Sequence, residues 1–475
     1  MTLSSAAPRG VNPWAATVLL LMGNFMNLID VSIVNVALPS IRADLNATET
    51  QIEWVSAAYV LAFAVGLLPC GRFGDKLGRK RLFLSGVGLF TLASVLCGLA
   101  PGIWVLIAAR ALQGIGGAMM VPQVMAIMHV LFPPEQKAKA FALAGFVVSL
   151  GAVSGPLLGG LLITADIQGL GWRPIFLVNL PIGLLVVLGG LRLIPTMSSD
   201  REMAIDWRGV ALFAAAITLV VLPVIEGPLL GWPWWSLVAL AMAAPVGWLF
   251  WRRQQALERA GREQLLPVQL LRDRGYLSGV IVVMMHFSAI PGMFLILAIY
   301  LQTGFGLTPL HSGLATAPFP LGVMLGSWVT ARFGIRAMTR RIAMGAGIML
   351  VGMIWLRHAA GHPPADLHLW TLAAPLALNG FGMGLAISPL FQMVLRDVPG
   401  PMAGAATGGM QAFQQVGAAI GIAIASSLFF VHLRGTDDYP AALAQALTYQ
   451  ICVFAAILTL LAIRSRAVRR ARVPG

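Results

Sequence analysis

The chain has 475 residues, of which 58% are hydrophobic and only 11% are charged. Because a soluble domain carries roughly 25% charged residues, this composition excludes an ordinary soluble fold and favours a membrane protein. The net charge of +14 is distributed in short basic clusters between apolar blocks, which argues against a nucleic-acid-binding protein.

The apolar residues form repeated blocks along the chain. A helix that crosses a bilayer needs about 20 apolar residues, and lipid cannot satisfy exposed backbone groups. The blocks are continuous and rich in Leu, Ala, Val and Gly, which favours helices over the alternating strands of a barrel. We therefore expect an all-α membrane protein with 14 spans, at roughly residues 14–38, 52–71, 80–100, 103–125, 138–164, 172–194, 207–226, 234–251, 276–301, 309–331, 341–358, 367–395, 402–432 and 441–463.

The distribution of Lys and Arg predicts the orientation of these spans. If both termini are cytoplasmic, 27 of the 32 basic residues lie in cytoplasmic segments, four lie on the outer side and Arg110 lies within a span. Basic residues concentrate on the cytoplasmic side of membrane proteins. The pattern therefore predicts a multi-pass membrane protein with both termini in the cytoplasm.

An internal repeat predicts the domain organisation. The segment Gly71–Arg81 (GRFGDKLGRKR) aligns without gaps with Ala331–Arg341 (ARFGIRAMTRR), and each joins the second and third spans of a set of six. We expect an N-terminal six-helix bundle (1–194), two extra transmembrane helices with a cytoplasmic linker (195–275) and a C-terminal six-helix bundle (276–475). Parallel repeats with a site at their interface are typical of transporters. The alternative is that Arg and Gly are simply common in cytoplasmic turns.

Asp30 and Arg110 are the charged residues that the sequence places well inside spans. Such residues usually mark a pathway or a proton relay, because burying an ionisable group in a membrane is costly. At 1.5 Å per residue, Asp30 lies roughly 12 Å and Arg110 roughly 10 Å from the outer end of their spans, so the two can meet. We hypothesise that protonation or cation binding at Asp30 weakens its attraction to Arg110. Alternatively, Asn24, Asn27 and Asn35 satisfy a purely structural Asp30, and Arg110 bonds only to backbone.

Motifs along nearly the whole chain carry a family resemblance. They are Leu28–Pro39, Gly71–Lys80, Arg110–Ala118, Gly151–Gly160, Trp172–Gly183, Asp206–Gly209, Tyr300–Gln302 and Gly306–Pro309. In this order and spacing they resemble the fourteen-span drug:proton antiporters of the major facilitator superfamily, the multidrug exporters of the EmrB and QacA type.

The resemblance implies a major facilitator fold and secondary active export of small amphipathic toxic compounds or drugs in exchange for protons by alternating access. The expected partners are the substrate, protons and membrane lipid, with no nucleic acid, cofactor or metal. Some members of this family work with a periplasmic adaptor and an outer-membrane channel, and the sequence does not decide whether this chain does.

The resemblance also implies a conformational latch formed by Gly71, Gly74, Asp75 and Arg79. The two glycines permit close helix approach, and an acidic side chain such as Asp75 interacts favourably with a helix N-terminus. In the second copy of the repeat, Ile335 replaces the acid, so we expect no equivalent latch there.

The fifth predicted span contains a motif that resembles one typical of exporters, with Gly151, Gly155, Pro156, Gly159 and Gly160. Small residues at intervals of four let helices pack closely in lipid, and Pro156 removes a backbone donor and can kink the helix. We expect a hinge whose packing changes between states. The alternative is ordinary small-residue packing.

Several polar residues in apolar spans are candidates for lining a substrate cavity, although hydrogen bonding between helices explains those of the second half better than substrate contact does. They are Asn27, Gln113, His286, Gln302, Asn379, Gln411 and Gln415. Gln411 and Gln415, four residues apart, share one helix face.

Other functions find less support in the sequence. No phosphate-binding loop, Cys/His metal set or nucleophile motif is visible, so we expect neither an enzyme nor an ATP-driven pump, unless a separate subunit supplies the ATPase. A porter for one specific metabolite is the main alternative. A non-transporting sensor or scaffold is less favoured, because the basic loop at 252–274 is too short to be a signalling domain.

Overall fold

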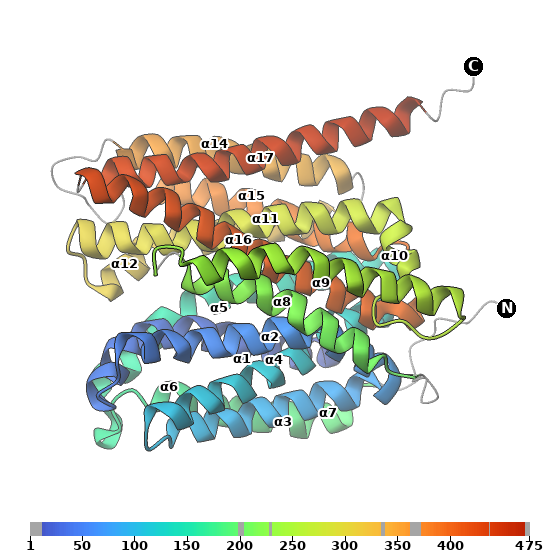
Figure 1. The fold of residues 1–475 in the computed structure, drawn as a ribbon, viewed down its shortest axis with the longest axis horizontal. Coiled ribbons are helices and arrows are strands. Elements are labelled where there is room, and N and C mark those ends of the chain that lie inside the picture. Colours follow the sequence, from blue (N-terminus) through green and yellow to red (C-terminus); the bar gives the residue numbers. More distant parts are fainter. Residues whose placement is uncertain are drawn as a thin grey trace. The chain divides into compact units, whose positions relative to one another are not determined.

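The computed structural model describes residues 12–197, 204–227, 230–333, 338–361, 372–436 and 438–470. Within these residues every regular element is a helix (Figure 1). Thirteen segments of the described chain are long and apolar enough to cross a membrane. The chain is therefore a multi-pass helical membrane protein, as its composition predicts. The remaining predicted span, 138–164, lies in α5 (Pro134–Ala165), which is not among the thirteen, so the count of fourteen stays a prediction.

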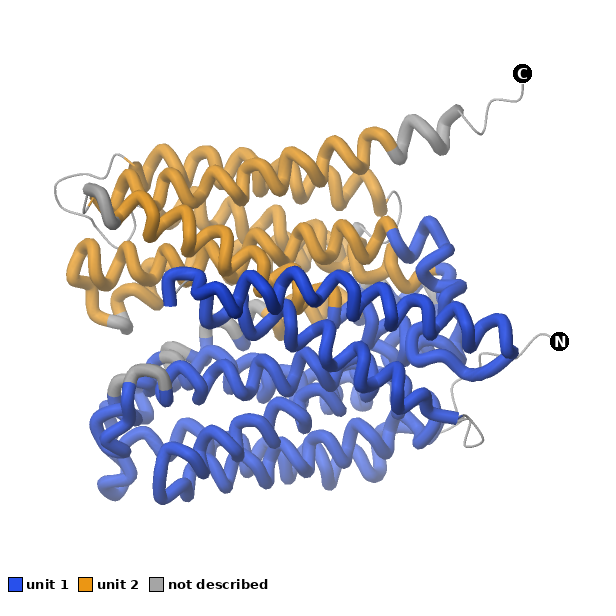
Figure 2. The backbone as a smooth tube through the Cα atoms, viewed as in Figure 1, with its two compact units in different colours: residues 1–140, 150–277, 397–412 blue, residues 141–149, 278–396, 413–475 orange. Residues whose placement is uncertain are grey.

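The chain divides into two compact units (Figure 2). Unit 1 comprises residues 1–140, 150–277 and 397–412, and unit 2 comprises residues 141–149, 278–396 and 413–475. Unit 1 contains α1 (Pro13–Asp44), α2 (Glu49–Leu77), α3 (Arg79–Gly98), α4 (Ile103–Leu131), most of α5, η1 (Ile167–Gly169), α6 (Pro174–Leu177), α7 (Asn179–Leu193), α8 (Trp207–Glu226), α9 (Trp234–Arg259), α10 (Val268–Arg272) and η3 (Gly400–Met402). Unit 2 contains η2 (Tyr300–Gly304), α12 (Pro309–Thr316), α13 (Pro318–Phe333), α14 (Met338–Gly361), α15 (Ala373–Leu395) and α17 (Tyr439–Arg470). Two further helices, α11 (Arg274–Ile299) and α16 (Ala403–Thr436), begin in unit 1 and continue in unit 2.

The first two helices begin at residues suited to capping. The Asn12 side chain accepts hydrogen bonds from the backbone of Trp14 at 2.9 Å and of Ala15 at 3.4 Å. At the start of α2, Thr48 and Gln51 form a reciprocal capping box. Both devices satisfy backbone N–H groups that have no partner inside the helix, so they fix where each span begins.

The second helix is longer than the sequence predicts. The expected span ended at residue 71, but α2 continues to Leu77 and buries Arg72 and Asp75. The chain then turns at Gly78, whose φ of +95° favours glycine, and α3 begins at the next residue. The predicted loop motif is therefore mostly helix. Arg72, Asp75 and Arg79 are paired within the protein, so these charges do not mark the end of the helix.

Prolines divide two of the predicted spans. The segment 172–194 forms α6 and α7, which separate at Val178, and Pro181 lacks the N–H that would bond across this junction. The segment 309–331 forms α12 and α13, which separate at Ala317, directly before Pro318. Each of these two predicted spans is therefore helical but consists of two consecutive helices.

Glycines bring the backbones of α13 and α15 into direct contact within unit 2. A Cβ atom added at Gly380 would lie 1.8 Å from the Phe319 carbonyl oxygen, and one at Gly322 would lie 2.1 Å from the Ala377 carbonyl oxygen. Small residues allow this approach, and it is a common way to pack helices in lipid. We call this contact the α13–α15 seam.

Candidate functional site

A buried ion pair joins α1 and α4. Asp30 is completely buried and Arg110 is 1% exposed. Nη1 of Arg110 donates to Oδ2 of Asp30 at 2.5 Å. The structure thus brings together the two intramembrane charges that the sequence places at similar depth.

The other oxygen of Asp30 is bonded by two amide side chains. Oδ1 accepts hydrogen bonds from Nε2 of Gln113 at 2.7 Å and from Nδ2 of Asn179 at 3.3 Å. Both amides also donate to the hydroxyl of Ser94, at 2.7 and 3.2 Å. Residues from α1, α3, α4 and α7 therefore form one polar cluster in an apolar interior.

Arg110 has further partners that hold its guanidinium in place. Its Nη1 also donates to Oε1 of Gln113 at 2.6 Å, and its Nε donates to the backbone carbonyl of Val55 at 3.1 Å. The guanidinium carbon lies 4.3 Å from the ring centroid of Tyr59, a cation–π distance. The hydroxyl of Tyr59 in turn accepts a hydrogen bond from Asn27.

Among the described residues, the two charges of the cluster, Asp30 and Arg110, are paired with each other. Removing one partner of a buried ion pair leaves an uncompensated charge, which costs about 3–5 kcal/mol. Protonation of Asp30 would cancel its charge and leave Arg110 without a counter-ion. Such a change would therefore remove an ionic contact between α1 and α4.

Sequence reasoning missed three members of this cluster. Asn179, Ser94 and Tyr59 are polar residues in apolar segments, a signal shared by many residues that only bond between helices. The asparagines considered as structural partners of Asp30 are placed differently. Within the described residues no hydrogen bond joins Asp30 to Asn24 or Asn27, and the side chain of Asn35 lies outside the description.

A second polar cluster in unit 1 contains the predicted latch residues. The carboxylate of Asp75 accepts hydrogen bonds from the backbone N–H groups of Gly404 and Ala405, each at 3.1 Å, at the start of α16. Nη2 of Arg79 donates to Asp75 at 2.8 Å and to the carbonyl of Gly400 at 2.7 Å. Asp75 thus satisfies N–H groups that a helix leaves unpaired at its first turn.

The two latch glycines lie where a larger residue would clash. A Cβ atom at Gly71 would lie 2.3 Å from the Gly404 carbonyl oxygen, and one at Gly74 would lie 2.0 Å from Oε1 of Gln123. These contacts let α2 approach the first turn of α16 and the middle of α4. In the second copy of the repeat, residues 334–337, which include Ile335, lie outside the described residues.

The glycines of the fifth span pack against α1. A Cβ atom at Gly151 would lie 2.7 Å from Leu28 Cβ, one at Gly155 would lie 1.8 Å from Ser32 Oγ, and one at Gly159 would lie 2.9 Å from Ile33 Cγ1. Gly160 differs from these three, since its added Cβ would meet nothing within 4 Å. Pro156 lies within α5, but its side chain is outside the description.

The polar candidates of the second half do not form a comparable hydrogen-bonded cluster in the described residues. The buried His286 ring lies with its Nε2 2.9 Å from the sulfur of Met383, and the Asn379 amide donates to the carbonyl of Pro375, one turn earlier in its own helix, at 2.8 Å. Gln302 lies half-buried in the π-helical turn η2. On α16, Gln411 is buried and Gln415 is half-buried.

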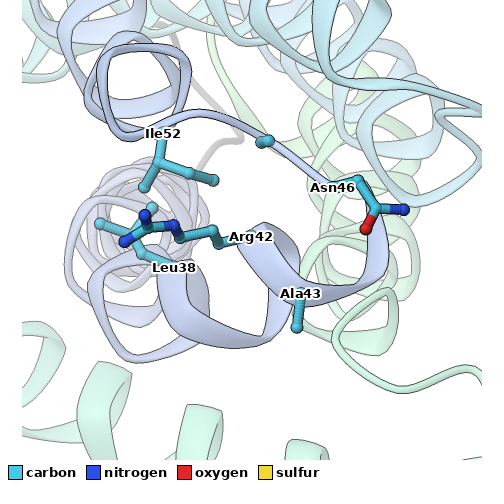
Figure 3. Close-up of a pocket in the computed structure, with 6 residues that line it drawn as sticks. Leu38, Arg42, Ala43, Asn46 and Ile52 are labelled. Atoms are coloured by element: carbon cyan, nitrogen blue, oxygen red, sulfur yellow. The ribbon is translucent and has the colours of Figure 1, made fainter.

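A pocket of about 640 Å³ lies at the connection between α1 and α2 (Figure 3). It is lined by Leu38, Arg42, Ala43, Asn46, Ala47 and Ile52. None of these is a predicted site residue. Among the described residues, no group of three or more His, Cys, Asp or Glu side chains could hold a metal ion.

Comparisons of the sequence with protein families and with known proteins find membrane transporters. The model of the Major Facilitator Superfamily matches residues 20–422. The chain is 38% identical over 428 residues to the "Probable actinorhodin transporter" of Streptomyces coelicolor, covering 90% of this chain and 74% of that protein. It is 35% identical over 422 residues to "Multidrug resistance protein Stp" of Mycobacterium tuberculosis, covering 87% and 75%. It is 30% identical over 453 residues to the "Tetracenomycin C resistance and export protein" of Streptomyces glaucescens, covering 91% and 79%.

Solved structures resemble the fold at low sequence identity. The human organic anion transporter MFSD10 superimposes with a TM-score of 0.69 at 16% identity, over 96% of this chain and all of that one. The proton:xylose symporter XylE superimposes with a TM-score of 0.65 at 14% identity, over 94% of each chain. At these identities the likeness concerns the fold alone.

Proposed function

Because the chain belongs to the major facilitator superfamily, we propose that it is a secondary active transporter that exports small amphipathic toxic compounds or drugs in exchange for protons. It belongs, in this proposal, to the fourteen-span drug:proton antiporters and works by alternating access. The names of its relatives, which include a multidrug resistance protein and a tetracenomycin C resistance and export protein, support export of drug-like compounds.

The observation that carries the coupling proposal is the buried Asp30–Arg110 ion pair. Asp30 takes up a proton from the outer side, its attraction to Arg110 weakens, and the helices that meet at the cluster rearrange. Release of the proton to the cytoplasm restores the pair. Substrate enters a central cavity from the cytoplasm or the inner leaflet. The polar residues of the second half, His286, Gln302 and Asn379, contribute to this cavity.

The latch and the hinge have separate roles in the proposed cycle. Asp75 and Arg79, bonded to the start of α16, stabilise one state of the cycle. The glycine contacts between α5 and α1 loosen and re-form as the state changes.

The protein lies in the bacterial inner membrane with both termini in the cytoplasm. Its two six-helix bundles, 1–194 and 276–475, are separated by the two extra helices.

A porter for one specific compound is the second candidate. Two relatives carry names that refer to a single compound, actinorhodin in one case and tetracenomycin C in the other. The breadth of the substrate range separates the candidates. A response to several chemically unrelated amphiphiles supports multidrug export, whereas a response to one compound supports a specific porter.

The test is drug-dependent proton release from energised inverted vesicles that contain the purified chain. The wild-type protein should release protons on addition of an amphiphilic drug, and Asp30→Asn should not. Asp44→Asn is the matched control, because Asp44 is an exposed acid at the end of the same helix. Release that persists in Asp30→Asn would remove this residue from the coupling step. Activity of the purified chain alone would also show that export needs no periplasmic adaptor or outer-membrane channel.

A further inference from the structure

The segment that joins α9, the second extra helix, to α11 is packed within unit 1. We call residues 260–273 the linker. Its leucines Leu265, Leu266 and Leu270 are at most 4% exposed, Val268 is completely buried, and the short helix α10 lies within it. The sequence predicts only a basic cytoplasmic loop here. Buried leucines and a helix indicate a segment with a fixed position.

A buried glutamine ties the linker to the extra helices. Oε1 of Gln254, on α9, accepts hydrogen bonds from the backbone N–H groups of Leu265 at 2.8 Å and Leu266 at 3.3 Å. Its Nε2 donates to Asp206, the residue directly before α8, at 3.1 Å. Asp206 is also paired with Arg253 at 2.5 Å. The ends of α8 and α9 and the linker backbone are therefore connected by hydrogen bonds.

The linker also contacts the first turns of α16. Just after the linker, the hydroxyl of Tyr276 donates to the carbonyl of Ala406 at 2.8 Å. A Cβ atom added at Gly409 would lie 2.9 Å from this hydroxyl and 3.1 Å from Leu266 Cδ1. The same stretch of α16 provides the N–H groups that Asp75 binds.

One linker side chain reaches the latch itself. Nη2 of Arg72 donates to the carboxylate of Glu263, while Nη1 of Arg72 lies 3.8 Å from Oδ2 of Asp75. The Arg72 side chain is 7% exposed, and these two carboxylates compensate its positive charge. Glu263 is 43% exposed, and its substitution should therefore leave the fold intact. Arg72 bridges the linker and the latch.

We propose that Glu263 is a positioning residue that, through Arg72, couples the two extra helices to the latch between α2 and the start of α16. This inference rests on the proposed role of Asp75 as a latch. Without the Glu263 carboxylate, Arg72 loses its direct partner, the end of α2 is less firmly held, and the contact of Asp75 with Gly404 and Ala405 opens more often. The extra helices thereby influence how long the transporter stays in one state.

The opening of the latch can be measured without substrate. Thr407, which is completely buried at this contact and bonds to the Pro122 carbonyl, is replaced by cysteine in a chain that carries Cys70→Ser, Cys97→Ser and Cys452→Ser. The measured quantity is the rate of alkylation by N-ethylmaleimide. Glu263→Gln should raise this rate roughly two- to fivefold, the range for a partly exposed ion pair.

Glu258→Gln is the matched control, because Glu258 pairs with Arg272 in the same region at 3.1 Å but not with Arg72. It should leave the rate unchanged. In an Arg72→Gln background, Glu263→Gln should add nothing further, since its effect acts through Arg72. Equal rates for Glu263→Gln and Glu258→Gln, or a full effect of Glu263→Gln in that background, would overturn the proposal.

The outcome is separate from that of the transport assay. Alkylation of the cysteine at position 407 is measured with neither drug nor proton gradient. A wild-type chain that releases no protons but shows the Glu263 effect would refute drug:proton antiport and keep the linker coupling. A chain that exports drugs but shows no Glu263 effect would do the reverse.

Discussion

Nη1 of Arg110 donates a hydrogen bond to Asp30 at 2.5 Å, and Nε of the same guanidinium donates one to the Val55 carbonyl at 3.1 Å. A single side chain on α4 therefore connects the charge of α1 to the backbone of α2. This arrangement makes the ion pair part of the packing of three helices.

The pair should show strong energetic coupling. Asp30→Asn or Arg110→Gln alone leaves one buried charge uncompensated and should lower the free energy of unfolding by about 3–5 kcal/mol. The double variant leaves neither charge, so its loss should be smaller than the sum of the single losses by at least about 1 kcal/mol. Denaturation of the four proteins in the same detergent gives the coupling. Losses that add to within about 0.5 kcal/mol would show that the two side chains act independently.

The glycines of α5 should differ in their tolerance of alanine. Gly155→Ala places a methyl group against Ser32 and Ile33 of α1, and overpacking of this kind costs about 1–3 kcal/mol. Gly160→Ala is the control on the same helix. Its methyl group meets nothing within 4 Å, and it should stabilise the helix by up to about 1 kcal/mol. Thermal unfolding of both variants tests this, and a similar midpoint for the two would contradict the close α1–α5 contact.

Asp75→Asn should weaken the latch measurably. The asparagine retains one oxygen but loses the negative charge that accepts from Gly404 and Ala405, and hydrogen bonds to charged groups contribute roughly 1.5–3 kcal/mol. The thermal midpoint should fall accordingly. Lys76→Gln, a neighbouring change of charge at a half-buried position, serves as the control. The prediction is wrong if both variants lower the midpoint equally.

Asp44, the last residue of α1, should make a pH-dependent contribution to the stability of the protein. Hydrogen bonds from Trp172 and Arg173 hold the pKa of the Asp44 carboxyl below its usual value of 3.8. A carboxyl whose pKa is lowered by folding stabilises the protein above its unfolded pKa and loses this effect as the pH falls through the folded value. Asp44→Asn should therefore be less stable than wild type at pH 7, by no more than about 1 kcal/mol for an exposed group. The difference should shrink below pH ~4, and an undiminished difference at pH 3 would contradict it.

The spans could be read from the sequence because each one is a local property. Apolar length alone places α8 at residues 207–226, where the structure has it. The depth of Asp30 and Arg110 also follows from counting along two helices. Their contact required only that α1 and α4 be neighbours.

The parts that the sequence does not reveal depend on distant residues. The carboxylate of Asp75 can be buried because the backbone N–H groups of Gly404 and Ala405, more than 300 positions later, donate hydrogen bonds to it. Asn179 belongs to the Asp30 cluster because α7 packs beside α3, where Ser94 provides a common acceptor. No local pattern distinguishes such a residue from one that only bonds between helices.

The α13–α15 seam limits which positions of unit 2 can accept a larger side chain. At Gly380 and Gly322 the partner backbone occupies the space of even a methyl group. No molecule can enter between these helices, and almost any side chain introduced there separates them. Under the proposed function, mutations that change the range of exported compounds should therefore avoid the seam and accumulate on helix faces that have room to vary.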